Sequence, residues 1–179
     1  ILHQKVFDCL ANADQHGLHM LLIKLDLQKA FDKVTIHQAL HLMTLMGAPE
    51  GVVAVLRQFY GNLARVLTVE GHARPTSVAH VYKGLVQGCP FSVILISLVT
   101  VVWSKEAMAA ASATGLPSDD SRSVGVGTFV DDRALWVATG HPGNTMACIR
   151  HIAERSARVD ELAKSKLHPD KGRQVGNTA

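Results

Sequence analysis

The stretch Met20–Leu27 reads MLLIKLDL, a short apolar run of the kind that forms a largely buried β-strand. Near its end it carries one carboxylate, Asp26. Burying a carboxylate among aliphatic side chains costs free energy unless a cation or strong hydrogen-bond donors meet it. Asp26 therefore either reaches solvent from the end of the strand or has a chemical role there.

A second acidic feature is the pair Asp131-Asp132 between two apolar segments, Val124–Val130 and Arg133–Ala138, which we predict to be a tight hairpin. Aspartate is a common turn residue, so an ordinary turn would account for the pair taken by itself. If the hairpin neighbours the first strand in one antiparallel sheet, the carboxylates can meet. They could then hold two Mg²⁺ ions about 4 Å apart, the arrangement that serves nucleotidyl transfer. Sequence separation does not decide whether the strands are neighbours.

Helical periodicity and turn residues organise the rest of the chain. Thr35 and Gln38 resemble a capping box, and Gly47 fits the position just after a helix end. We expect helices at Ile1–Gly17, Ile36–Met46, Glu50–Tyr60, Ser92–Ala113 and Thr145–Leu167, and a further hairpin from Leu63–Glu70 and Ala73–Tyr82. Helices and antiparallel pairs interleave, which predicts an α+β fold, an antiparallel sheet with helices packed on one face.

Composition is consistent with one globular domain over residues 1–179, in which the polar stretch 114–123 is a flexible insertion. With 47% apolar and 18% charged residues the chain is not a disordered tail. A net charge of +3 permits a nucleic-acid partner without arguing for one. Three scattered cysteines without a CxxC pair favour an intracellular, reducing compartment. The longest apolar stretch, Phe91–Trp103, is too short for a membrane span, so we expect no membrane partner.

LDLQKAFD at 25–32 resembles the first palm motif of reverse transcriptases, in the form usual for non-LTR retrotransposons and group II introns. GLVQGCPFS at 84–92 resembles the second, FVDD at 129–132 the third and LHPDK at 167–171 the fourth. They occur in the family's order and cover nearly the whole chain. The resemblance implies the palm of an RNA-directed DNA polymerase, which adds deoxynucleotides to a primer.

The resemblance also implies a set of metal ligands. Asp26 and Asp131 would be the principal Mg²⁺ ligands, with Mn²⁺ as a substitute, and the backbone carbonyl of Leu27 an extra ligand. Asp132 would complete the acidic cluster near the primer end.

The implied nucleotide contacts come from the first and second motifs, and Leu27 is among them. Phe31 would lie beneath the sugar of the incoming dNTP, where a flat ring leaves no room for a 2′-hydroxyl, although core packing would also explain it. Gln87 and Gly88 would pack against the template base and the nascent pair. Lys171 would protonate the leaving pyrophosphate, whereas a lysine in a C-terminal loop is more often simply solvated.

Several positions depart from the family pattern: Val86, Val93, Arg133 and His168. A cation at Arg133 could compete with Mg²⁺ or pair with Asp132. The expected partners are an RNA template, a DNA primer and dNTP, with the missing fingers and thumb supplied by the same polypeptide. The expected location is intracellular, and the sequence does not decide between the nucleus and an organelle.

Two alternatives remain open. One is a catalytically inactive palm, either a retroelement-derived relic or an RNA-binding module, which the departures favour. The other is the palm of an RNA-dependent RNA polymerase. That class typically has a polar residue where Phe31 stands and GDD in place of FVDD, so the sequence argues against it.

Overall fold

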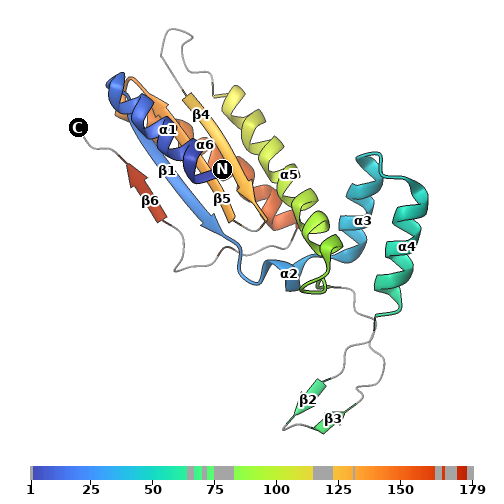
Figure 1. The fold of residues 1–179 in the computed structure, drawn as a ribbon. Helices are drawn as coiled ribbons and strands as arrows, with labels where there is room; N and C mark the ends of the chain where they lie inside the picture. Colours follow the sequence, from blue (N-terminus) through green and yellow to red (C-terminus); the bar gives the residue numbers. More distant parts are fainter. Residues whose placement is uncertain are drawn as a thin grey trace. The chain divides into compact units, whose positions relative to one another are not determined.

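The computed structural model describes residues 2–63, 67–69, 72–74, 83–114, 123–130, 132–163, 167 and 173–176 (Figure 1). They fall into two compact units, Ile1–Gln28 with Val99–Ala179, and Lys29–Leu98. Each unit is described by itself. Because the predicted insertion lies mostly within 115–122, outside the described residues, it stays a prediction, as does the single-domain organisation.

The first unit is built on a four-stranded sheet. Its elements are α1 (Leu2–Gln15), β1 (His19–Asp26), β4 (Ser123–Phe129), β5 (Asp132–Thr139), α6 (Pro142–Leu162), β6 (Arg173–Gly176) and the later turns of α5 (Pro90–Ser112). The strand order is β4-β5-β1-β6, and every neighbouring pair is antiparallel. The α+β class and the antiparallel sheet are therefore confirmed.

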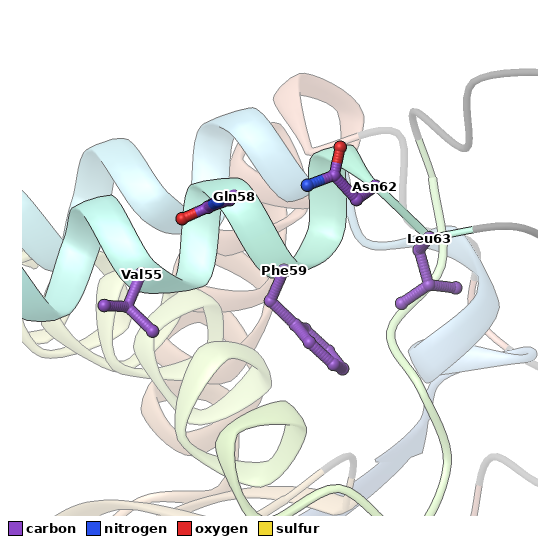
Figure 2. A pocket seen from close by; sticks show the side chains of 5 residues that line it. All are labelled: Val55, Gln58, Phe59, Asn62 and Leu63. Atoms are coloured by element: carbon purple, nitrogen blue, oxygen red, sulfur yellow. The ribbon is translucent and has the colours of Figure 1, made fainter.

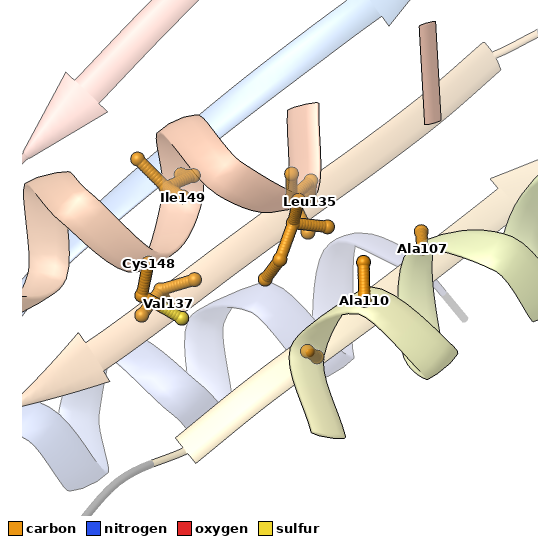
Figure 3. Close-up of a cluster of buried hydrophobic side chains, with 8 residues drawn as sticks. Ala107, Ala110, Leu135, Val137, Cys148 and Ile149 are labelled. Atoms are coloured by element: carbon orange, nitrogen blue, oxygen red, sulfur yellow. The ribbon is translucent and has the colours of Figure 1, made fainter. Parts of the chain in front are cut away.

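Alternate residues of β5 point to opposite faces of the sheet and build two cores. On one face Leu135 and Val137 pack against α5 and α6, where Cys148, Ile149 and Ile152 are buried (Figure 3). On the other face Ala134, Trp136 and Ala138 pack with Met20 of β1 and Ala13 of α1. The sheet differs from the expectation of helices on one face, because α1 covers the second face.

The second unit contains α2 (Ala30–Lys33), α3 (Ile36–Leu45), α4 (Glu50–Gly61), β2 (Leu67–Val69), β3 (His72–Arg74) and the first turns of α5. Its core includes Ala39 and Leu40 of α3 and Val53, Leu56 and Tyr60 of α4, all nearly inaccessible to solvent.

Helix ends follow the expected turn chemistry in part. Gly47 has φ +84° just after α3, as its position predicted. The capping box at Thr35 is wrong: Thr35 is the N-cap, but its side chain makes no capping hydrogen bond. Its backbone instead forms an antiparallel bridge with Lys83. The start of α3 is therefore held by backbone pairing with a residue far away in the sequence, which the local capping pattern did not predict.

Some boundaries also differ. Helix α6 begins three residues before the predicted Thr145, because Pro142 opens it and the His141 ring accepts a hydrogen bond from Gly143 N at 3.1 Å. It ends at Leu162 rather than Leu167. The β2–β3 hairpin forms, but its predicted extensions at 64–66, 70–71 and 75–82 lie outside the described residues.

Within the described part of the chain, one helix, α5, is long and apolar enough by length and composition to cross a membrane. The stretch that was expected to be too short thus lies inside a 23-residue helix. Core helices of globular proteins meet the same criterion, and Leu95, Ile96, Trp103 and Ala107 of α5 have no exposed surface. The helix is therefore weak evidence for a membrane.

Candidate active site

The carboxylates of the first and third motifs meet at one end of the sheet. Asp26 is the last residue of β1 and Asp132 the first of β5, and the two are direct partners across the antiparallel ladder. Directly opposed residues have Cβ atoms about 5 Å apart on the same face. The condition set by the sequence, that the two strands be neighbours, is met.

Lys24 joins these carboxylates and was not foreseen. Its Nζ lies 3.2 Å from Asp132 Oδ1, and both side chains are partly exposed. Lys24 precedes Asp26 by two residues, so it shares its face of β1, and that period-two spacing in an apolar strand was the available signal. The pair places a cation against a carboxylate predicted to belong to a metal site.

The hairpin that carries the acidic pair has a strained turn. Phe129 and Asp132 are the closing partners, and Val130 is the first residue after Phe129. Val130 has φ +57°, a left-handed conformation that a β-branched side chain disfavours. Such a residue costs about 1–3 kcal/mol and persists where the surrounding structure holds it. Asp131 itself lies outside the described residues.

Arg133 neither competes for the metal nor pairs with Asp132, and both expectations are wrong. It is next along β5, so its side chain points to the opposite face. There it is fully buried, its Nη1 donating to Asp160 Oδ1 at 2.6 Å and its guanidinium lying 4.8 Å from the centre of the Trp103 ring. Burial raises the pKa of Asp160, while the charge and hydrogen bond of Arg133 act in the opposite direction.

Leu27, and the described residues on either side of the fourth motif, lie at the same end of β1. Leu27 is buried and forms an antiparallel bridge with Leu167, the first residue of the fourth motif. Arg173, at the start of β6, pairs with Lys24. Lys171 lies outside the described residues, but described residues on both sides of it pair with β1 within two residues of Asp26.

In the second unit, Phe31, Gln87 and Gly88 line one open pocket of about 380 Å³ with Cys89, Pro90 and Val93. Leu85 N donates to Phe31 O at 2.8 Å, and this hydrogen bond joins the second motif to the first. Gly88 has φ +86° in the turn, a conformation that glycine adopts without strain. Three of the four predicted nucleotide-binding residues are thus neighbours, and their roles, like that of Leu27, remain predictions.

A hydrogen-bond chain beneath that turn was also missed. Tyr60 is 2% exposed, and its hydroxyl lies 2.9 Å from Ser92 Oγ. Ser92 Oγ donates to Val86 O at 2.7 Å, so the Tyr60 hydroxyl is the donor to Ser92. Burial raises the pKa of Tyr60, and the Ser92 hydrogen bond lowers it. The chain ties α4 to the residue that precedes Gln87.

A larger hollow, of about 530 Å³, lies along α4 (Figure 2). It is lined by Val55, Gln58, Phe59, Asn62 and Leu63, none of which was a predicted site residue. Val55 and Phe59 are exposed apolar side chains, and this surface offers no titratable group. This hollow is larger than the pocket at Phe31, but its described lining residues offer no group for acid–base chemistry.

Comparison with known proteins decides the family. The model of the family "Reverse transcriptase (RNA-dependent DNA polymerase)" matches residues 2–176. The chain belongs to the reverse transcriptase family. No curated protein matches the sequence.

Two solved structures share this reverse transcriptase fold. One is telomerase from Candida tropicalis in complex with a TWJ fragment of telomeric RNA, with TM-score 0.69 and 12% identity over 98% of this chain and 30% of that chain. The other is apo telomerase from the same organism truncated from its C-terminal domain, with TM-score 0.54 and 14% identity over 98% of this chain and 35% of that chain. The chain therefore spans about a third of the length of these telomerases.

The donor set suits the divalent ions that the reverse transcriptase family generally uses. Among the residues that the structure describes, no group of three or more His, Cys, Asp or Glu could hold a metal ion. Asp26 and Asp132 nevertheless supply two opposed carboxylates, and Asp131 follows Val130 directly in sequence. Carboxylate and carbonyl oxygens are the ligands that Mg²⁺ and Mn²⁺ prefer, so the residues present fit such a group.

Proposed function

We propose that this chain is the catalytic palm of an RNA-directed DNA polymerase of the non-LTR retrotransposon or group II intron type. It transfers the nucleotidyl group of a dNTP to a primer 3′-hydroxyl. The observation that carries the proposal is the pairing of Asp26 with Asp132 across β1 and β5, next to the FVDD hairpin.

The carboxylates of Asp26 and Asp131, with the Leu27 carbonyl, hold Mg²⁺ in this proposal, and Asp132 completes the acidic cluster. When bound, two Mg²⁺ ions lower the pKa of the primer 3′-hydroxyl and neutralise charge on the leaving pyrophosphate. The 3′-hydroxyl gives up its proton to solvent, its oxygen forms a bond to the α-phosphorus, and the bond from that phosphorus to pyrophosphate breaks. Lys171 donates a proton to that leaving group, an electrostatic task that suits an ammonium ion.

The pocket of the second unit receives the nucleotide. Phe31 lies beneath the deoxyribose, so that a 2′-hydroxyl would clash with its ring and ribonucleotides are excluded. Gln87 and Gly88 contact the template base and the nascent pair. Their presence with Phe31 in one pocket supports this assignment.

The partners are an RNA template and a DNA primer. The telomerase solved with telomeric RNA supports an RNA partner for this fold. The second candidate function is an inactive palm that binds RNA, and the departures at Val86, Val93 and His168 favour it. An RNA-dependent RNA polymerase is less well supported, because Phe31 lines the pocket.

Primer extension on an RNA template by the full chain tests the proposal. We expect dNTP incorporation that Asp26→Asn abolishes and that Asp14→Asn, an exposed carboxylate on α1, leaves unchanged. Phe31→Ala should admit ribonucleotides. Absence of incorporation with intact RNA binding would favour the inactive palm, and preference for NTP in the wild type would favour the RNA polymerase.

A further inference from the structure

Arg133 directly follows the acidic pair and places a fully buried guanidinium beside it in sequence. Asp160 accepts one hydrogen bond from it, at 2.6 Å, and the Trp103 ring covers it at 4.8 Å. Its Nε and Nη2 have no hydrogen-bond partner among the described residues. A buried ion pair with unsatisfied donors is no more stabilising than well-packed apolar side chains, so stability does not explain this arrangement.

The position of the pair suggests what it does instead. Arg133 is the second residue of β5, Trp103 lies on α5 and Asp160 lies in the last turn of α6. All three belong to the same compact unit. The pair therefore fixes the first residues of β5 to two helices on the face away from Asp132.

The turn that precedes β5 needs such an anchor. Val130 holds φ +57°, which a β-branched residue keeps only where the surrounding structure determines it. The pairing of Phe129 with Asp132 closes the turn, and Arg133 is the next residue along the strand. Releasing Arg133 would let Val130 return to an unstrained conformation and carry the acidic pair with it.

We propose that Arg133 is a positioning residue whose buried contacts with Asp160 and Trp103 hold the start of β5 and the strained residue Val130 before it, and so support the proposed metal site. This inference rests on the proposed function, since it assumes that Asp131 and Asp26 bind a divalent ion. It concerns residues that do not touch the metal.

The test is Mn²⁺ affinity of the full chain, measured by electron paramagnetic resonance, with the double variant Arg133→Met, Asp160→Leu. Removing both partners leaves no unpaired buried charge, and a methionine sulfur packs well on the Trp103 ring, so the fold should be kept. We expect Mn²⁺ affinity to fall about tenfold, the loss typical when the support of a metal ligand is removed. Adding Val130→Gly should restore affinity, because glycine adopts positive φ without strain.

Ile149→Ala is the matched control. It damages the same core, where Ile149 is 1% exposed, and should lower stability without changing Mn²⁺ affinity. Asp160→Asn is the second variant should the double variant not fold: it has the same shape, leaves the Arg133 charge unpaired and should also weaken Mn²⁺ binding.

Unchanged Mn²⁺ affinity in the folded double variant, or in Asp160→Asn if the double variant is unfolded, would overturn the inference. So would failure of Val130→Gly to restore binding. If wild type binds no Mn²⁺, or if Asp26→Asn binds it equally well, the proposed function fails and takes this inference with it. Loss of binding in Asp26→Asn but not in the Arg133 and Asp160 variants would overturn the inference and leave the proposed function standing.

Discussion

Tyr60 is connected to the proposed nucleotide pocket by two hydrogen bonds. Its hydroxyl donates to Ser92, which donates to the carbonyl that precedes Gln87. Tyr60→Phe removes the first of these hydrogen bonds, worth about 1 kcal/mol. We expect a comparable loss of stability and a several-fold rise in the KM for dNTP with little change in kcat. Steady-state primer extension measures this, and an unchanged KM would show that the turn does not depend on α4.

Lys24 forms an ion pair with Asp132, the carboxylate proposed to complete the acidic cluster at the metal site. Because its ammonium pairs with Asp132 at 3.2 Å, it opposes the arrival of another cation. Lys24→Met should therefore raise Mn²⁺ affinity, most clearly at low salt, while stability changes by less than about 1 kcal/mol. Lys5→Met on α1 is the control of equal charge. Weaker Mn²⁺ binding in Lys24→Met would mean that Lys24 supports the site.

The burial of Asp160 sets a sign for the pH dependence of stability. Burial raises its pKa above the ordinary value of 3.8, although Arg133 acts against this. A carboxyl with a higher pKa in the folded state binds its proton more tightly there, so the folded state gains stability as pH falls towards 3.8. Wild type should therefore gain in unfolding free energy relative to Asp160→Asn between neutral and acid pH. Urea denaturation tests this, and a relative loss would mean that pairing outweighs burial.

The sequence motifs predicted which acidic residues would matter, but not every contact that these residues and their neighbours make. The opposition of Asp26 and Asp132 depends on β1 and β5 being neighbours, a condition that the sequence alone did not decide. The buried ion pair of Arg133 could not be predicted, because its partner Asp160 is 27 residues away and no local pattern marks the two as a pair.

At the scale of elements, β4 shows how closely the sheet packs. Gly125 pairs directly with Trp136 on β5, and a Cβ at Gly125 would overlap the indole ring. Gly125→Ala should therefore cost about 1–3 kcal/mol, since the ring must leave its place in the core. Gly51→Ala in α4 meets no atom within 4 Å and should be neutral or stabilising. Chemical denaturation compares the two, and equal stability would show that Trp136 has room to move.

Long elements with clear periodicity were predicted within a few residues, as for α4 and β5. The four-residue elements α2 and β6 were missed, because a pattern so short carries little periodic signal. Strand β6 also exists through its pairing with β1, which is a tertiary contact. The second helical layer, α1, was predicted as a helix, but its sequence does not state which face of the sheet it covers.

At the scale of the whole molecule, the predicted site residues are distributed over two compact units. The unit with β1 and β5 holds the carboxylates, and the unit from Lys29 to Leu98 holds the pocket lined by Phe31, Gln87 and Gly88. Asp26 of the first motif and Asp132 of the third motif belong to one unit, although they lie more than a hundred residues apart in the sequence. Motif order revealed the family, and the antiparallel pairing explains why that order brings the acidic residues together.

The measurement that tests the central claim most directly is Mn²⁺ binding by the full chain as wild type, Asp26→Asn, Asp131→Asn and Asp14→Asn. If the carboxylates at the end of β1 and in the β4–β5 hairpin form the metal site, the first two variants should each lose at least about tenfold in affinity. Asp14→Asn on α1 should bind as wild type does. Equal affinity in all four proteins would contradict the account.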